Sequence, residues 1–250
     1  MGGHSHWAGI KHKKAITDAK KGKVWTKIVR EITIAAKMGG GDPGSNPRLR
    51  QAIDDAKASN MPADNVKRAI MKGTGELPGV VYEELTYEGF GPGGVAMLVE
   101  VTTDSRNRTL GQIRLIFEKH GGSLGGAGSV AWMFKPKGLI RVLKASAKDE
   151  DTLMGQALDF GAEDFIADDA EAYEIYSNPQ DLNKIKDGLL AQKVPVASAE
   201  LIMKPENTVP VGERDAPKIL AIMEELEEHD DVKAVHANFD IPDHILAKLE

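Results

Sequence analysis

Two glycine-containing motifs in this sequence have the residue types and spacing of known catalytic or cofactor sites. Residues 89–94, GFGPGG, match the G-x-G-x-x-G pattern of dinucleotide binding, and residues 121–125, GGSLG, match the G-x-S-x-G pattern that exposes a nucleophilic serine. The first chemistry needs a helix directly after the glycines, and the second needs a strand before the serine and a helix after it. The order expected here is strand, turn, strand for the first motif and helix, loop, strand for the second. We therefore predict a turn and a loop, and no nucleophilic role for Ser123.

A third candidate site is the tripeptide Gly2-Gly3-His4. If Met1 is removed, the terminal amine, two backbone amides and the His4 imidazole could surround Cu(II) or Ni(II) in a square plane, a hypothesis that copper titration of the native protein and of His4→Ala would test. The chain has no cysteine and contains neither a G-x-x-x-x-G-K-[ST] nor an H-E-x-x-H motif. We therefore expect no enzyme activity, no cofactor, no catalytic metal and no small-molecule substrate.

Charge is divided unevenly along the chain. The formal net charge is −6, yet residues 1–75 hold 15 Lys or Arg against 6 Asp or Glu, which leaves 17 basic and 32 acidic residues for positions 76–250. Basic side chains gain affinity for polyanions by releasing condensed counterions from phosphates, whereas carboxylates are repelled. We therefore expect the N-terminal part to bind nucleic acid, DNA or structured RNA. The alternative is that its Lys-rich helix face is only solvated.

The candidate contacts lie in an N-terminal arm and on the helices after it. In the arm, Trp7 and the histidines can stack on bases or donate hydrogen bonds while the lysines contact phosphates. On the helices the candidates are the basic side chains of the exposed faces. The predicted nucleic-acid-binding residues of this part are His4, His6, Trp7, Lys11, His12, Lys13, Lys14, Lys20, Lys21, Lys23, Lys27, Arg30, Lys37, Arg48 and Arg50.

Residues 1–78 are predicted to form this arm and an all-α head of three or four helices. A helix over residues 20–38 places its apolar residues on one side and five cations, Lys20, Lys23, Lys27, Arg30 and Lys37, nearly opposite. Residues 39–41 are glycines that end this helix. Asn46-Pro47 and residues 60–62 each begin another helix, and Gly73 is predicted to supply the left-handed stop of the last one.

From about residue 80 the apolar period changes from that of a helix to that of strands. A hairpin over residues 81–103, a helix over 106–120 and a strand over 129–134 give ββαβ, and residues 139–203 follow the order βαββαβ of ferredoxin-like domains. A final helix over 216–228 and strand over 232–239 would complete the first unit. We therefore predict an α+β multidomain protein in which a domain of residues 136–205 is inserted into a discontinuous domain of residues 79–135 and 206–250. Three consecutive domains are the alternative.

Several long segments resemble the YebC family: GHSHWAGIKHKKAITDAKKGKVWTKIVREITIAAKMGGGDPGSNPRLR, NMPADNVKRAIMKGTGE, YEELTYEGFGPGGVAMLVEVTTDSRNRT and KHGGSLGGAGSVAWMF. The resemblance spans essentially the whole chain and implies an α-helical N-terminal domain followed by two α+β domains, one inserted in the other. It also makes the turn over residues 104–109, with Arg106 and Arg108, a second candidate contact with nucleic acid; solvated arginines at a helix start are the alternative. The sequence departs from the family pattern at His6, where Lys is usual, and at Gly9, where Asn is usual, which weakens the expected arm contact.

The resemblance leaves two functions open. Bacterial members of the family carry the label of DNA-binding transcriptional regulators, whereas a mitochondrial relative is a translational activator of cytochrome oxidase and members are also viewed as ribosome-associated. The sequence shows no convincing helix-turn-helix with a short turn, while a Gly/His/Lys arm with one Trp suits unpaired RNA at least as well as DNA. No segment approaches the roughly 18 apolar residues of a membrane span, so we expect a cytoplasmic protein with no membrane partner.

Overall fold

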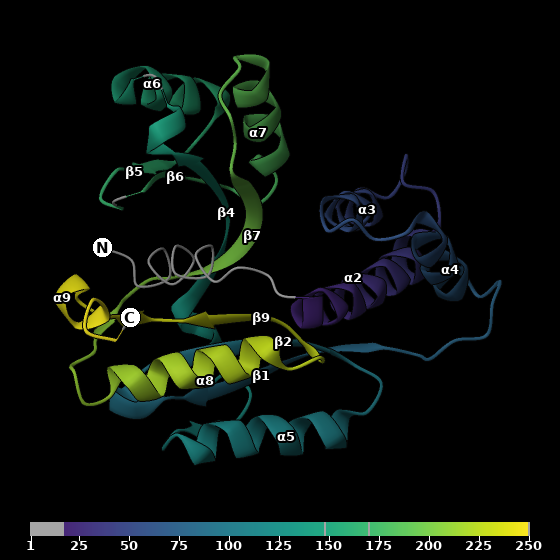
Figure 1. Cartoon of the computed structure of the whole chain (residues 1–250), viewed down its shortest axis with the longest axis horizontal. Coiled ribbons are helices and arrows are strands. Elements are labelled where there is room, and N and C mark those ends of the chain that lie inside the picture. Colours follow the sequence, from purple (N-terminus) through teal and green to yellow (C-terminus); the bar gives the residue numbers. More distant parts are fainter. Residues whose placement is uncertain (1–17, 148, 170, 250) are drawn as a thin grey trace. The chain divides into compact units, whose positions relative to one another are not determined.

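The computed structural model describes residues 18–147, 149–169 and 171–249 (Figure 1); for residues 18–21 and 243 it describes the backbone only. It contains an all-helical segment followed by helices that pack on mainly antiparallel sheets, which confirms the α+β class. Among the described residues, 18–129 and 213–235 form one compact unit, and 130–212 and 236–249 form another. We describe the two units separately.

Three helices make up the head: α2 (Asp18–Gly39), α3 (Pro47–Ala58) and α4 (Ala63–Thr74). Helix α3 begins as its sequence predicts, because the Asn46 side chain accepts a hydrogen bond from the Leu49 amide and Pro47 occupies the first turn. The three helices pack around small and aliphatic side chains, which lets their backbones approach closely. These buried residues are Ile32, Ala35, Ala36, Leu49, Ala52, Ala56, Met61 and Ala69.

The predicted stop of α4 at Gly73 is wrong. The helix continues to Thr74, and Gly75, with φ +84°, is the left-handed residue that ends it. Gly73 serves packing instead, since a Cβ atom there would lie 2.4 Å from the Thr33 carbonyl oxygen and 2.7 Å from the Ala36 Cβ. A glycine at a helix crossing and a glycine at a helix end look alike in the sequence.

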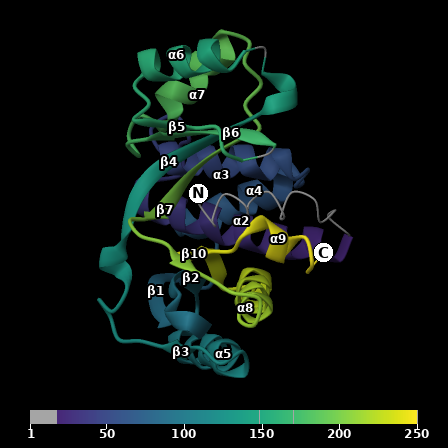
Figure 2. The same ribbon diagram turned by 90° about the vertical axis from the view of Figure 1, so that its left-hand side faces the viewer.

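The same unit contains a four-stranded sheet in the order β3-β1-β2-β9. Strands β1 (Glu83–Phe90) and β2 (Ala96–Thr103) form an antiparallel hairpin, β3 (Ser123–Leu124) pairs with the end of β1, and β9 (Val232–Ala237) adds to β2. Helices α5 (Arg106–Lys119) and α8 (Ala216–Glu228) lie side by side along one face of this sheet (Figures 1 and 2). The late segment of the chain therefore completes a sheet that starts near residue 83, as the sequence predicts.

The strand predicted over residues 129–134 is wrong. Residues Ala131–Met133 form a 3-10 turn, and the third strand of the first sheet is instead the two-residue β3 inside the glycine loop. Strand β4 starts only at Phe134 and runs through Pro136 and Gly138 to Leu143. The Lys-Pro-Lys-Gly segment, residues 135–138, is thus part of a strand. Pro136 is tolerated there because β4 pairs only with β7 at this position, and its pairing with β6 begins at Gly138.

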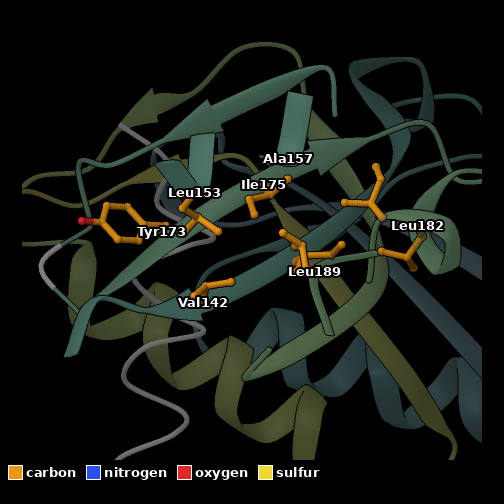
Figure 3. Close-up of a cluster of buried hydrophobic side chains, with 9 residues drawn as sticks. Val142, Leu153, Ala157, Tyr173, Ile175, Leu182 and Leu189 are labelled. Atoms are coloured by element: carbon orange, nitrogen blue, oxygen red, sulfur yellow. The ribbon is translucent and has the colours of Figure 1, made fainter. Parts of the chain in front are cut away.

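The second unit has the element order β4 (Phe134–Leu143), α6 (Glu150–Phe160), β5 (Asp164–Ile166), β6 (Ala172–Ser177), α7 (Leu182–Ala191) and β7 (Ser198–Pro205). Its sheet has the antiparallel order β5-β6-β4-β7. The core lies between the sheet and the two helices, and Figure 3 shows Val142, Tyr173 and Ile175 of the strands facing Leu153 and Leu189 of the helices. This unit also holds the short parallel pair β8 (Val209–Pro210) and β10 (Phe239–Asp240), and α9 (Asp243–Leu246).

Candidate nucleic-acid interface

Part of the predicted interface lies outside the described residues. This holds for the arm residues His4, His6, Trp7, Lys11, His12, Lys13 and Lys14, and for the side chains of Lys20 and Lys21, which belong to the first turn of α2. Eight predicted contacts have described side chains: Lys23, Lys27, Arg30, Lys37, Arg48, Arg50, Arg106 and Arg108. Five of them have an acidic or carbonyl partner within the same unit, and three have no such partner among the described residues.

The basic face of α2 lies against the carboxyl-terminal end of α8. Lys27 Nζ donates to the Glu227 carbonyl oxygen at 2.5 Å, and Lys23 Nζ lies 3.9 Å from Glu228 Oε2. Arg30 donates to the Asp230 carbonyl oxygen just beyond the helix. The last carbonyls of an α-helix lack intrahelical partners and carry partial negative charge, so cations from another element stabilise them.

Asp231 is the centre of the most buried part of this contact. Its side chain is 3% exposed, forms an ion pair with Arg30 at 2.7 Å, and accepts hydrogen bonds from Arg108 at 2.8 Å and from Thr109 at 2.5 Å. Thr103 Oγ1 adds a third hydrogen-bond donor at 3.1 Å. Burial by itself would raise the pKa of Asp231, but the Thr109 and Arg108 hydrogen bonds and the charges of Arg30 and Arg108 together lower that pKa to about 2.

Arg48 belongs to a second charged group. Its guanidinium donates to Glu31 Oε1 at 2.6 Å and to Glu84 Oε1 at 2.5 Å, so that one arginine joins helix α2 to strand β1. Lys233 Nζ lies 3.3 Å from Glu31 Oε2. Although burial opposes it, the hydrogen bond and charge of Arg48 and the charge of Lys233 lower the pKa of the Glu31 carboxyl. This geometry is that of a structural ion pair.

Other cations of this unit are exposed and have no ion pair among its described residues. Residues 31–75 carry 7 basic and 5 acidic side chains, so most of the positive excess of the head lies in residues 1–30, where 8 basic residues accompany Asp18 alone. Arg68 is exposed and donates to the Asn65 side chain. The exposed cations without an ion pair among the described residues include the predicted contacts Lys37, Arg50 and Arg106, together with Lys67 and Lys72.

The acidic partners of α2 are the feature that the sequence analysis missed. Lys27 and Glu227 are 200 residues apart, and no local pattern links them. The signal available in the sequence is a run of six acids among residues 224–231, EELEEHDD, at the end of a predicted helix. Such a run can be read as a solvated or capping segment, and only the sheet order that adds β9 to β2 brings it to the head.

The two catalytic-looking motifs have the local structure that the sequence predicts. Residues 92–94 form a 3-10 turn between β1 and β2, with Gly93 and Gly94 at φ +74° and +80°. Ser123 lies exposed on β3, after helix α5 and a glycine turn, so no helix follows it. The described residues contain no group of three or more His, Asp or Glu side chains suited to a metal ion. Within the same residues, no helix is both long and apolar enough to span a membrane.

The connection between α3 and α4 is short. It consists of residues 59–62, and Asn60 adopts a left-handed conformation with φ +55°. A helix-turn-helix pair uses a turn of this length, although the same length also occurs in ordinary helical hairpins. The exposed side of α4 carries Lys67, Arg68 and Lys72. The short turn that the sequence analysis did not find is therefore present.

The fold and the charged surfaces define a class of protein: an α+β chain of several domains with a basic helical segment at its start. Residues 5–76 match the model of the TACO1/YebC protein N-terminal domain, and residues 82–239 match that of the TACO1/YebC second and third domain. The chain belongs to the TACO1/YebC family, which confirms the resemblance noted in the sequence.

Relatives across the whole length support this assignment. A probable transcriptional regulatory protein of Dictyoglomus turgidum is 56% identical over 250 residues, covering 100% of both chains. One of Dictyoglomus thermophilum is 55% identical over 249 residues with the same coverage. The crystal structure of a conserved hypothetical protein from Aquifex aeolicus has a TM-score of 0.87 and 47% identity, covering 96% of this chain and 99% of that one. The names of these curated relatives describe regulatory proteins rather than enzymes.

Proposed function

We propose that this chain is a non-enzymatic regulator of gene expression that binds nucleic acid through its N-terminal part. The observation that carries the proposal is the concentration of positive charge in residues 1–30, eight basic residues against one acid, within a chain of net charge −6. The cations Lys37, Arg50, Lys67 and Lys72, which are exposed and have no ion pair within the described part of the chain, extend this charge over the head. Following the names of its relatives, DNA is the first candidate target and transcription the first candidate process.

Contacts with phosphate groups would contribute most of the affinity of this protein for nucleic acid. Lysines and arginines neutralise phosphates and release counterions, while Trp7 and the arm histidines stack on or hydrogen-bond to bases. Five of the predicted contacts have partners within the protein: Lys23, Lys27, Arg30, Arg48 and Arg108. We therefore assign the main contact with nucleic acid to the arm and to the exposed cations Lys37, Arg50, Lys67 and Lys72. No small molecule or cofactor takes part in this function.

A second candidate is a translation factor that contacts rRNA or tRNA on the ribosome in the cytoplasm. The composition of the arm favours it, because glycine, histidine, lysine and one tryptophan suit irregular or unpaired RNA. The four-residue turn between α3 and α4 favours DNA. Sedimentation of a lysate separates the two: association with ribosomes that RNase abolishes selects translation, and association that DNase abolishes selects transcription.

The salt dependence of binding tests the proposal itself. Replacing Lys11, Lys13 and Lys14 with Gln should lower the log–log salt slope by about 2 to 3, because each phosphate contact contributes roughly 0.7 to 0.9. A matched control replaces Lys135, Lys184 and Lys193 with Gln, which removes the same charge from the other unit. An arm variant whose slope equals that of the control would contradict the assignment to the arm.

We also propose that the domain order predicted from the sequence holds, with residues 136–205 inserted between residues 79–135 and 206–250. The sheet order β5-β6-β4-β7, which is that of a ferredoxin-like domain, and the addition of β9 to β2 support this proposal. Limited proteolysis tests it. Cleavage in the exposed loops at residues 125–128 and 206–208 should release a folded fragment and leave the two outer segments associated.

A further inference from the structure

The end of α8 and the start of β9 form a compact acidic corner, residues Glu227–Asp231, that lies against the basic face of α2. Glu227 and Asp230 present carbonyl oxygens to Lys27 and Arg30, and Glu228 presents a carboxylate to Lys23. The shape of the corner is fixed internally, because the Asp231 amide donates to His229 Nδ1 at 3.1 Å. Burial lowers the pKa of His229, which favours the neutral ring that accepts this hydrogen bond.

The corner presents to α2 what a nucleic-acid backbone would present. It offers a row of oxygen atoms carrying full or partial negative charge, spaced along the helix at Lys23, Lys27 and Arg30. Oxyanions of phosphate groups are recognised by the same lysine and arginine donors. The cations of α2 can therefore serve the corner or a phosphate, but a given donor cannot serve both fully at once.

The contact has a strong part and a weak part. Arg30 is 13% exposed and its partner Asp231 is 3% exposed, so this pair is shielded from water. Lys23 and Glu228 are 49% and 47% exposed and 3.9 Å apart, a geometry in which an ion pair contributes little to stability. Water and phosphate can thus reach the outer lysine, while the inner arginine stays in place.

We propose that the acidic corner is a built-in competitor for the basic face of α2, which nucleic acid displaces at Lys23 and Lys27 while the Arg30–Asp231 pair holds. This inference rests on the proposed function and concerns the regulation of that same surface. Its consequence is that nucleic-acid binding at α2 is coupled to release of the carboxyl-terminal turn of α8. The coupling is reciprocal, since anything that holds this turn more tightly weakens binding.

The test is removal of the competing charge. The double variant Glu227→Gln/Glu228→Gln keeps the backbone carbonyls and the buried Asp231, so it retains the strong part of the contact. It should bind a short labelled RNA or a DNA duplex of the same length about two- to fivefold more tightly at low salt, as expected for the loss of the exposed Lys23–Glu228 pair and of one further negative charge next to Lys27. The control Glu118→Gln/Glu200→Gln removes equal charge from exposed positions without an ion pair among the described residues.

Two further measurements separate local competition from a general change in charge. In the Lys23→Gln/Lys27→Gln background the gain should disappear, and in the wild type nucleic acid should speed amide exchange at residues 226–229. If the affinity increases equally in the control, or still increases in the background without the two lysines, the acidic corner is not a competitor. Salt-dependent binding by the wild type would still support the proposed function in that case. If neither probe binds any of these proteins in a salt-dependent way, the proposed function fails and the competitor with it.

Discussion

Several charged residues of this protein form internal ion pairs that their residue type alone does not predict. The sequence presents Arg30, Arg48 and Arg108 as members of a basic surface, and the structure gives each of them carboxylate partners. Asp231 shows the converse, since an acid in the EELEEHDD run accepts three hydrogen bonds, pairs with Arg30 and is nearly fully buried. The charge of each residue could be predicted from the sequence, but its partner could not, because most of the partners lie 17 to 201 residues away along the chain.

The pKa of Asp231 leads to a prediction about acid stability. A carboxyl whose folded-state pKa is about 2, against an ordinary value of 3.8, stabilises the fold above pH 4 and loses that contribution as the pH falls toward 2. Asp231→Asn should therefore lower the free energy of unfolding at pH 7 by about 2 kcal/mol or more and make it less dependent on pH between 4 and 2. Chemical denaturation at a series of pH values measures both effects.

A neighbouring acid provides the control for this experiment. Asp104 pairs with the same Arg108 at 2.8 Å, but its side chain is 34% exposed. Asp104→Asn should therefore cost less than about 1 kcal/mol at pH 7. Equal losses in the two variants would mean that Asp231 acts as one surface charge among others and not as a buried centre.

At the scale of elements, prediction succeeded where the information was local. The Asn46-Pro47 helix start, the turn over residues 92–94 and the βαββαβ order all follow from neighbouring residues. It failed at Gly73 and at residues 129–134, where tertiary contacts decide. A two-residue strand such as β3 is too short to have a period and exists only because β1 offers an edge.

The close packing at Gly73 leads to a prediction about the stability of the helical head. Gly73→Ala should destabilise the head by about 1 to 2 kcal/mol, because the added Cβ meets the Thr33 carbonyl oxygen at 2.4 Å and this overpacking outweighs the better helix propensity of alanine. Gly111→Ala, in the exposed middle of α5 with no atom within 4 Å of the new Cβ, should instead stabilise by up to about 1 kcal/mol. Thermal unfolding of the two variants checks the opposite signs.

At the scale of the whole molecule, the sequence predicts that charge is segregated but not that part of it is neutralised internally. Residues 76–250 contain 32 acidic and 17 basic residues, which predicts that this region repels nucleic acid. The structure adds that four of these acids contact the basic helix: Glu227, Glu228, Asp230 and Asp231. Long-range pairing of this kind follows from sheet order, which sequence periodicity does not determine.

The position of β9 has a consequence for synthesis of the protein. Strand β2 is complete by residue 103, but its outer neighbour, residues 232–237, leaves the ribosome almost last. Until then the nascent chain carries an uncovered strand edge, and Arg30 and Arg108 lack their shared carboxylate. A polypeptide interrupted before residue 230 would therefore be prone to edge-to-edge association. The β1–β2 hairpin is protected from intermolecular pairing only after α8 and β9 have been synthesised.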